Sequence, residues 1–170
     1  MATASEMAGF KFNHTMLRVK DPKASLMFYQ DVLGMKLIKE VRNDDAKFSL
    51  YFLAFDHDQS LKDIDTKSES EKWTAAISRV LELTWNHGTE SDPEFKGYAN
   101  GNSEPGRGFG HIAVTVDDLD KACDRFEKLN VRFQKRPTDG KMRNIAFVLD
   151  PDGFTGIIAA SILFYSLRCR

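Results

Sequence analysis

The sequence predicts an α+β fold made of two βαβββ units. Three observations support this: a strand motif that occurs twice, a helical stripe after each copy, and three strand-like runs after each helix. The motif H-x-x-[L/V]-x-V-x-D begins at His14 and again at His111. Such self-similarity is the mark of a duplicated architecture. We expect the organisation to be a first unit over 12–87, a glycine-rich crossover over 88–110, and a second unit over 111–160 with an atypical C-terminal segment over 154–170.

In the first unit, the motif alternates apolar and polar residues as a half-buried strand does. An apolar stripe at helical spacing follows, and Gly34 is placed to end that helix. The stripe consists of Leu26, Tyr29, Val32 and Leu33. Three strand-like runs come next: MKLIKEV (35–41), KFSLYFLAF (47–55) and SRVLELTW (78–85). The charged segment over 56–72 is predicted to be an exposed loop.

The second unit repeats this order. Its helical stripe consists of Leu119, Ala122, Cys123, Phe126 and Leu129. This spacing favours a packing role for Cys123 over a reactive one. The strand-like runs are VRFQKR (131–136), NIAFVL (144–149) and FTGIIAA (154–160). A βαβββ unit leaves one sheet face open, so we expect two units to close a half-open β-barrel, within one chain or between chains.

Composition restricts the function classes. The chain has 24 basic and 25 acidic residues and a net charge of −1, which argues against nucleic acid or an anionic membrane as the main partner. Two cysteines make no disulfide framework and suit a reducing compartment. The stretch MATASEMAGFKF lacks the pattern of a signal peptide, and no apolar stretch reaches the roughly 18–20 residues of a membrane span. We therefore expect a soluble, cytoplasmic protein.

Two strands carry candidate metal ligands. Residues two apart on a strand share a face, so His14 lies on the face of Arg18, and Glu82 on that of Thr84 and Asn86. Together with His111, these side chains could bind a divalent first-row metal ion. A histidine at a strand start is more often a hydrogen-bonded structural residue, whereas a carboxylate within an apolar strand is costly to bury alone. From spacing alone, both interpretations stay open.

The repeat makes a further prediction about the last strand. If Glu82 ends the first unit, an acid should end the second, within FTGIIAA. The inward face there carries Thr155 and Ile157, and residues 154–170 contain no Asp or Glu. The second unit is therefore predicted to lack the acid that the first unit has.

Seven motifs, in order, resemble the glyoxalase I (lactoylglutathione lyase) family of the vicinal-oxygen-chelate superfamily. They are NHTMLRVKDP, GMKLIKE, KFSLYFLAF, LELTWNHGTE, GNSEPGRGFGHIAV, DGKMRNIAF and DPDG. The resemblance runs from about Phe12 to Gly153. His14 is similar to the residue of fungal members, which are often tandem double-length chains, so this chain resembles one of their halves.

The resemblance implies an activity: metal-dependent isomerisation of the hemithioacetal of glutathione and methylglyoxal to S-lactoylglutathione. It implies zinc, with nickel or cobalt as alternatives, held by His14, Glu82 and His111, with Glu82 also catalytic as the base. The implied substrate-binding residues are Arg18, Asn86, Arg107, His111, Lys135, Lys141 and Met142. Guanidinium groups suit the two carboxylates of glutathione. Lys135 could instead be a solvated strand charge, and Leu50 and Phe52 could line an apolar pocket or pack in the core.

The chain departs from the family pattern after Gly153. The family continues with an aromatic residue, any residue, an aliphatic residue and then glutamate, whereas this chain reads Phe154-Thr155-Gly156-Ile157. The fourth ligand and usual base is thus replaced by Ile157, and we expect impaired catalysis. All residues after Gly153 depart from the family pattern at once, which suggests that the chain has a different final coding segment. Alternatives are a non-catalytic protein that binds glutathione conjugates and a dioxygenase with two histidines and one carboxylate. We expect a homodimer.

Overall fold

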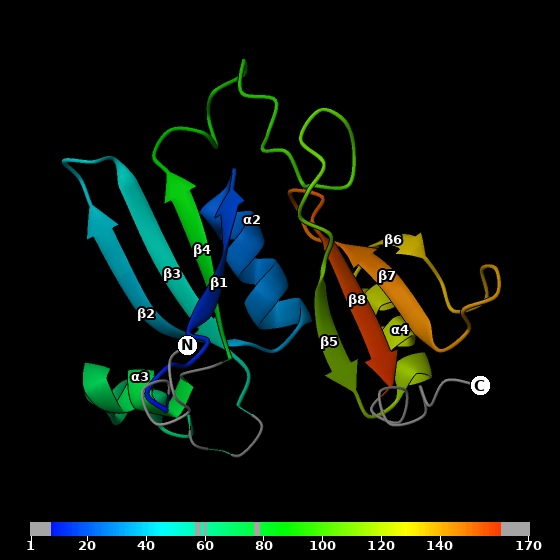
Figure 1. Ribbon diagram of the computed structural model, residues 1–170, viewed down its shortest axis with the longest axis horizontal. Helices are drawn as coiled ribbons and strands as arrows, with labels where there is room; N and C mark the ends of the chain where they lie inside the picture. The colour runs from blue at the N-terminus through cyan, green and yellow to red at the C-terminus, as the bar shows by residue number, and fades with distance from the viewer. Residues whose placement is uncertain (1–7, 57–58, 60, 77–78, 161–170) are drawn as a thin grey trace. The chain divides into compact units, whose positions relative to one another are not determined.

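The computed structural model describes residues 8–56, 59, 61–76 and 79–160 (Figure 1). The chain divides into two compact units, 1–95 and 96–170. Residues 161–170 of the predicted C-terminal segment lie outside the described residues, as does Ser78 at the start of one predicted strand. Within the described part, no helix is long and apolar enough to cross a membrane.

The first unit is a four-stranded sheet with helices. Its strands are β1 (His14–Val19), β2 (Lys36–Asn43), β3 (Phe48–Ala54) and β4 (Val80–Asn86). Its helices are α2 (Pro22–Met27), a π-helical turn (Phe28–Val32), a 3-10 turn (Ile64–Thr66) and α3 (Glu69–Ala76). The strand order is β1-β4-β3-β2. Strand β1 runs parallel to β4, and the other neighbours are antiparallel.

The second unit has the same topology. Its elements are β5 (Ile112–Val116), α4 (Leu119–Lys128), β6 (Arg132–Lys135), β7 (Ile145–Leu149) and β8 (Thr155–Ala160). The strand order is β5-β8-β7-β6, with β5 parallel to β8 and the other neighbours antiparallel. The prediction of an α+β fold with two βαβββ units is confirmed. Among the described residues, neither sheet closes on itself into a barrel.

The aspartate that ends each repeated motif is a helix cap. Asp21 accepts hydrogen bonds from the backbone N–H groups of Lys23 (2.9 Å) and Ala24 (3.4 Å) at the start of α2. Asp118 accepts one from the N–H of Lys121 (3.0 Å) at the start of α4, and this bond holds the pKa of Asp118 below its usual value. Aspartate is a preferred N-cap because it satisfies N–H groups that have no partner within the helix. The motif therefore encodes a strand followed by a helix start.

Both faces of the first sheet bury apolar side chains. The side chains of Leu17, Val19, Leu53 and Leu83 are buried on one face. On the other face, the core cluster contains Ile38, Phe52, Ala54, Leu61, Ala76 and Val80, with Trp73 packed against it. Strand β4 is consequently buried from Val80 to Thr84. A polar side chain in the middle of this strand must find its partners inside the protein.

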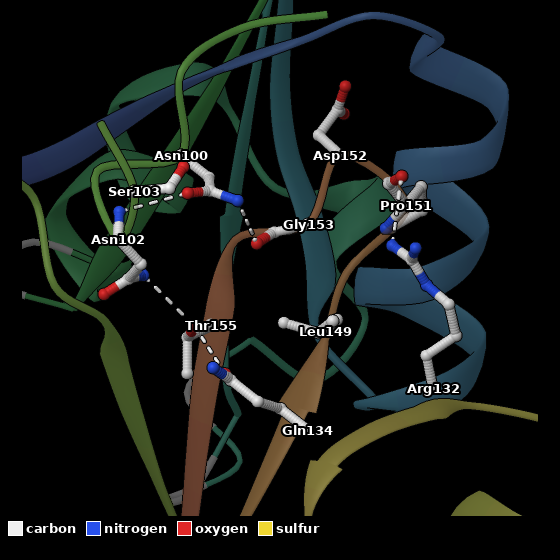
Figure 2. A pocket seen from close by; sticks show the side chains of 10 residues that line it. All are labelled: Asn100, Asn102, Ser103, Arg132, Gln134, Leu149, Pro151, Asp152, Gly153 and Thr155. Atoms are coloured by element: carbon white, nitrogen blue, oxygen red, sulfur yellow. Dashed lines mark hydrogen bonds between the residues drawn. The ribbon is translucent and has the colours of Figure 1, made fainter. Parts of the chain in front are cut away.

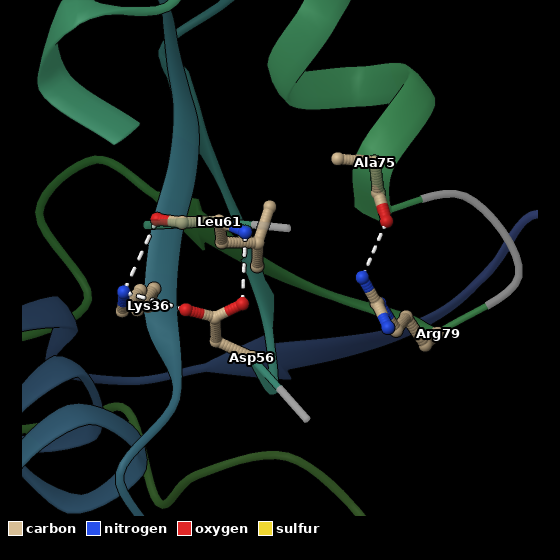
Figure 3. A network of polar contacts seen from close by, with 5 residues as sticks. All are labelled: Lys36, Asp56, Leu61, Ala75 and Arg79. Carbon is tan, nitrogen blue, oxygen red and sulfur yellow. Dashed lines mark hydrogen bonds and ion pairs between the residues drawn. The ribbon is translucent and has the colours of Figure 1, made fainter. Parts of the chain in front are cut away.

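The prediction of an exposed loop over 56–72 is wrong in part. Leu61 is fully buried, and α3 begins at Glu69. Asp56 accepts a hydrogen bond from the N–H of Leu61 (2.8 Å) and pairs with Lys36 (2.8 Å), as Figure 3 shows. The Lys36 ammonium also donates to the carbonyl of Leu61 (3.1 Å). The buried Leu61 side chain and the contacts of Asp56 and Lys36 with the Leu61 backbone hold a segment whose charged composition suggested a loop.

Candidate metal and substrate site

The first unit places a carboxylate beside an imidazole. Glu82, in the middle of β4, is 8% exposed. Its Oε2 atom lies 3.0 Å from Nε2 of His14, at the start of β1. Its Oε1 atom accepts a hydrogen bond from the Thr84 hydroxyl at 3.0 Å. Both oxygens thus have a partner, which lowers the cost of burying the charge.

The second ring nitrogen of His14 has its own partner. Nδ1 lies 2.7 Å from Oδ1 of Asn13, so each ring nitrogen of His14 faces an oxygen atom. An imidazole nitrogen and a carboxylate oxygen, both common ligands of first-row metals, thus lie side by side. Nitrogen and oxygen ligands bound at about 2.0–2.1 Å to one ion are about 2.9–3.4 Å apart, so the 3.0 Å separation fits a first-row metal.

The third predicted ligand belongs to the second unit. His111 is exposed and immediately precedes β5, as His14 begins β1. In the described part of the chain, no three His, Cys, Asp or Glu side chains gather into one group. The structure therefore brings His14 and Glu82 together, while His111 occupies the equivalent start of the other sheet.

The position equivalent to Glu82 in the second unit carries no donor atom. In each sheet, the strand pairings define the ladder partners of this position. These are Met16 and Phe52 for Glu82, and Ala113 and Phe147 for Ile157. Met16 and Ala113 each lie two residues beyond the histidine that opens its unit. Ile157 is half-buried, so the second sheet presents an apolar side chain where the first presents an acid.

Two of the predicted substrate-binding residues lie in the first unit. Arg18 is exposed on β1 and is the ladder partner of Thr84. Asn86 is half-buried at the end of β4, on the face of Glu82. Both side chains therefore belong to the sheet face that carries the His14–Glu82 pair.

The remaining predicted substrate-binding residues lie in the second unit. Arg107 is exposed in the crossover, where it pairs with Glu104 (3.2 Å). The Lys135 ammonium, at the end of β6, donates to the carbonyls of Met142 (2.6 Å), Arg136 (2.9 Å) and Ile145 (3.3 Å). Lys135 thus links the two ends of the 136–145 loop by hydrogen bonds. Lys141 and Met142 are exposed in this loop.

Of the predicted pocket residues, Phe52 belongs to the core cluster of the first sheet, and Leu50 is partly buried against that cluster. The Phe52 ring stands edge-on to His14, with centroids 6.1 Å apart, and edge-on to Trp73 at 5.1 Å. Phe52 therefore packs in the core and also contacts the imidazole ring of His14. The two roles that the sequence left open are both compatible with this contact.

A cavity of about 460 Å³ within the second unit adds residues that the sequence did not indicate (Figure 2). Asn102 donates to the Thr155 hydroxyl (3.2 Å), which donates in turn to Oε1 of Gln134 (3.0 Å). Asn100 donates to the carbonyl of Gly153 (3.0 Å). Ser103 and Arg132 also line the cavity. The polar residues of the crossover follow no repeating pattern. The sequence therefore indicated only a glycine-rich segment there and not these hydrogen bonds.

The surroundings of Cys123 disfavour its thiolate form. Burial raises the pKa of its thiol, and the nearby carboxylate of Asp120 raises the pKa further. The reactive form of cysteine is the thiolate, so this environment disfavours reaction. The packing role that the helical stripe predicts agrees with this environment.

Comparisons with known proteins agree with the geometry. A family model described as "Glyoxalase/Bleomycin resistance protein/Dioxygenase superfamily" matches residues 11–156, ending one residue before Ile157. The chain is 53% identical to a lactoylglutathione lyase of Pseudomonas putida, covering 86% of this chain and 83% of that protein. It is 48% identical to a lactoylglutathione lyase of Schizosaccharomyces pombe, covering 91% of this chain but only 48% of that protein. The chain thus spans about half of the fungal relative.

A solved structure supports the fold as a whole. A trypanothione-dependent glyoxalase I of Leishmania major superimposes with a TM-score of 0.66 at 27% identity. The match covers 92% of this chain and 91% of that one. The two repeated units are therefore matched over nearly their whole length.

Proposed function

The chain belongs to the glyoxalase/bleomycin resistance protein/dioxygenase superfamily, and from this premise we propose that it is a lactoylglutathione lyase. The reaction converts the hemithioacetal of methylglyoxal and glutathione to S-lactoylglutathione. One observation carries the proposal: the buried Glu82 carboxylate faces His14 at 3.0 Å in a chain 53% identical to a lactoylglutathione lyase.

The proposed metal ligands are His14, Glu82 and His111. Imidazole and carboxylate donors suit Zn²⁺ and also accept Ni²⁺ or Co²⁺. When bound, the ion supplies Lewis-acid stabilisation of the negative charge that develops on the substrate oxygens. The 3.0 Å separation of Nε2 and Oε2 in the first unit is the observation that supports His14 and Glu82 as ligands.

Proton transfer falls to Glu82 in this proposal. Its carboxylate removes a proton from the carbon beside the carbonyl and returns it to the neighbouring carbon. A second acid is missing at position 157, so one carboxylate serves as ligand and as base. General acid–base help is worth roughly 10²–10⁴-fold in rate. We therefore propose a metal-dependent but slow lyase.

Glutathione is proposed to bind through cationic and amide groups. Arg18 and Arg107 would hold its carboxylates, because guanidinium groups form bidentate pairs with them. Asn86 would contact the peptide from the end of β4. Lys135, Lys141 and Met142 would contact it from the second unit. The native protein is proposed to be a cytoplasmic homodimer, in keeping with the balanced charge and the lack of a disulfide framework.

Ile157 favours a second candidate function, which is binding of glutathione conjugates without turnover. An apolar side chain in place of an acid leaves the anion-binding groups intact and removes a proton acceptor. Such a protein would retain a non-reacting S-alkylglutathione and release it unchanged.

One experiment separates the two. The purified chain is loaded with Zn²⁺ or Ni²⁺ and given methylglyoxal and glutathione, and S-lactoylglutathione is quantified. Metal-dependent product that disappears on chelation is the expected result. Calorimetric binding of S-hexylglutathione with no product above the uncatalysed rate would establish the binding function instead.

A further inference from the structure

We propose that Thr84 is a positioning residue that fixes which oxygen of Glu82 faces the metal ion. The inference rests on the proposed function, because it takes Glu82 as a ligand. Thr84 acts through Glu82 and is not assigned a contact with substrate.

The geometry gives each carboxylate oxygen one role. The Thr84 hydroxyl donates to Oε1 at 3.0 Å, and Oε2 lies 3.0 Å from Nε2 of His14. A glutamate side chain has several rotatable bonds, so a free carboxylate could turn either oxygen toward the ion. With Oε1 held, Oε2 stays on the side of His14. The hydroxyl thereby favours a one-oxygen ligand.

Burial strengthens the hydrogen bond between Thr84 and Glu82. Glu82 and Thr84 are both 8% exposed. Water therefore competes poorly for either group, and a hydrogen bond to an ionised acceptor is stronger than one between neutral groups. If the Glu82 carboxylate rotated away, the buried Thr84 hydroxyl would lose its acceptor. The free-energy cost of that loss disfavours the rotation.

The second unit shows that the fold itself does not require a hydroxyl there. Thr84 pairs with Arg18 across β1 and β4, and the equivalent pair across β5 and β8 is Thr115 with Ala159. Ala159 is fully buried and apolar. The unit that has the acid also has its hydroxyl donor, and the unit with Ile157 lacks both. The second sheet therefore forms without a hydroxyl at this position.

Two substitutions separate the hydroxyl from the packing role. Thr84→Val keeps the shape of the side chain and removes the donor, whereas Thr84→Ser keeps the donor and removes the methyl group. Co²⁺ affinity is measured for the metal-free chain by titration of the visible absorption spectrum. Residues that orient metal ligands typically contribute about 10–100-fold to metal affinity. Thr84→Val is therefore expected to bind Co²⁺ about tenfold or more weakly, and Thr84→Ser close to the native value.

Thr74→Val serves as a matched control, because Thr74 is exposed on α3. All variants are first checked for a native thermal unfolding midpoint. In the lyase assay, Thr84→Val is expected to lower kcat with little change in KM. Equal Co²⁺ affinity of native and Thr84→Val proteins, or equal weakening by Thr84→Ser, would overturn the proposal.

The Co²⁺ titration is independent of turnover. A chain that forms no S-lactoylglutathione but binds Co²⁺ in a Thr84-dependent way would refute the lyase proposal and leave the positioning role standing. A native chain that binds no Co²⁺ would overturn the positioning role, whatever its turnover.

Discussion

Ile157 occupies in the second sheet the ladder position that Glu82 occupies in the first. Each lies on the strand that pairs in parallel with the first strand of its unit, opposite the residue two beyond the opening histidine. The two-fold pattern therefore assigns Ile157 to the place of a second acid. The two sheets thus share a topology but not the donor atom at this position.

Replacement of Glu82 by glutamine tests the metal site. Glutamine keeps the size of the side chain and can still accept from Thr84, but it removes the anionic oxygen that faces His14. Because even residues beyond the ligands contribute about 10–100-fold, the affinity for Zn²⁺ is expected to fall by more than about 100-fold. Competition with a chromophoric chelator measures it.

Glu40→Gln is the matched control, because Glu40 is exposed on β2 of the same sheet. It should leave the Zn²⁺ affinity at the native value. Equal affinities of the Glu82→Gln and native proteins would mean that Glu82 is not a ligand.

Lys135→Met is expected to raise KM for the hemithioacetal about tenfold with a smaller effect on kcat. Methionine keeps the apolar stem but removes the ammonium that bridges the carbonyls of Met142 and Ile145. A hydrogen bond to a charged group is worth about 1.5–3 kcal/mol, which corresponds to roughly tenfold or more. Lys121→Met is the control, because Lys121 is exposed on α4. Steady-state kinetics of both variants are compared. Identical KM values would remove Lys135 from the substrate site.

Asp56→Ala is expected to lower the free energy of unfolding by about 2 kcal/mol, measured by urea denaturation. The substitution removes the acceptor of the Leu61 N–H and the partner of Lys36 (Figure 3). Asp44→Ala removes the Arg42 partner in an ion pair whose side chains are 59% and 70% exposed. Such exposed pairs contribute about 0–1 kcal/mol. A similar loss in both variants would show that Asp56 is merely a surface charge.

Gly101→Ala is expected to destabilise the protein by about 2 kcal/mol or more. Gly101 has a φ of +84°, and a Cβ atom there would overlap the backbone of Phe109. Both effects disfavour any side chain. Gly108→Ala is the control, since a Cβ at Gly108 meets open space. If thermal unfolding shows the two variants to be equally stable, Gly101 does not lie against the Phe109 backbone.

The duplicated fold could be predicted because its signals are local. Each motif combines strand alternation with the aspartate that caps the next helix, and Asp21 and Asp118 both perform that role. The face shared by Glu82 and Thr84 follows from the period of a strand alone. The α3 helix escaped prediction because Leu61 and Trp73, its apolar anchors, lie in a segment of mostly charged residues.

The finer features of the site depend on contacts between distant segments. That Thr84 donates to Oε1 and that His14 faces Oε2 follows from the parallel register of β1 and β4. The network of Asn102, Thr155 and Gln134 joins the crossover to two strands. No local pattern specifies such pairings, because polar residues in turns and crossovers lack a period.

The role of position 157 is tested by the rate of S-lactoylglutathione formation by the native chain beside Ile157→Glu, both loaded with Zn²⁺. Ile157→Gln, which adds a polar side chain without a base, is the control. We expect a slow native chain and a rate roughly 10²–10⁴-fold higher for Ile157→Glu, with Ile157→Gln near the native rate. A native rate that glutamate at this position does not improve would contradict the claim that Ile157 stands in the place of a catalytic acid.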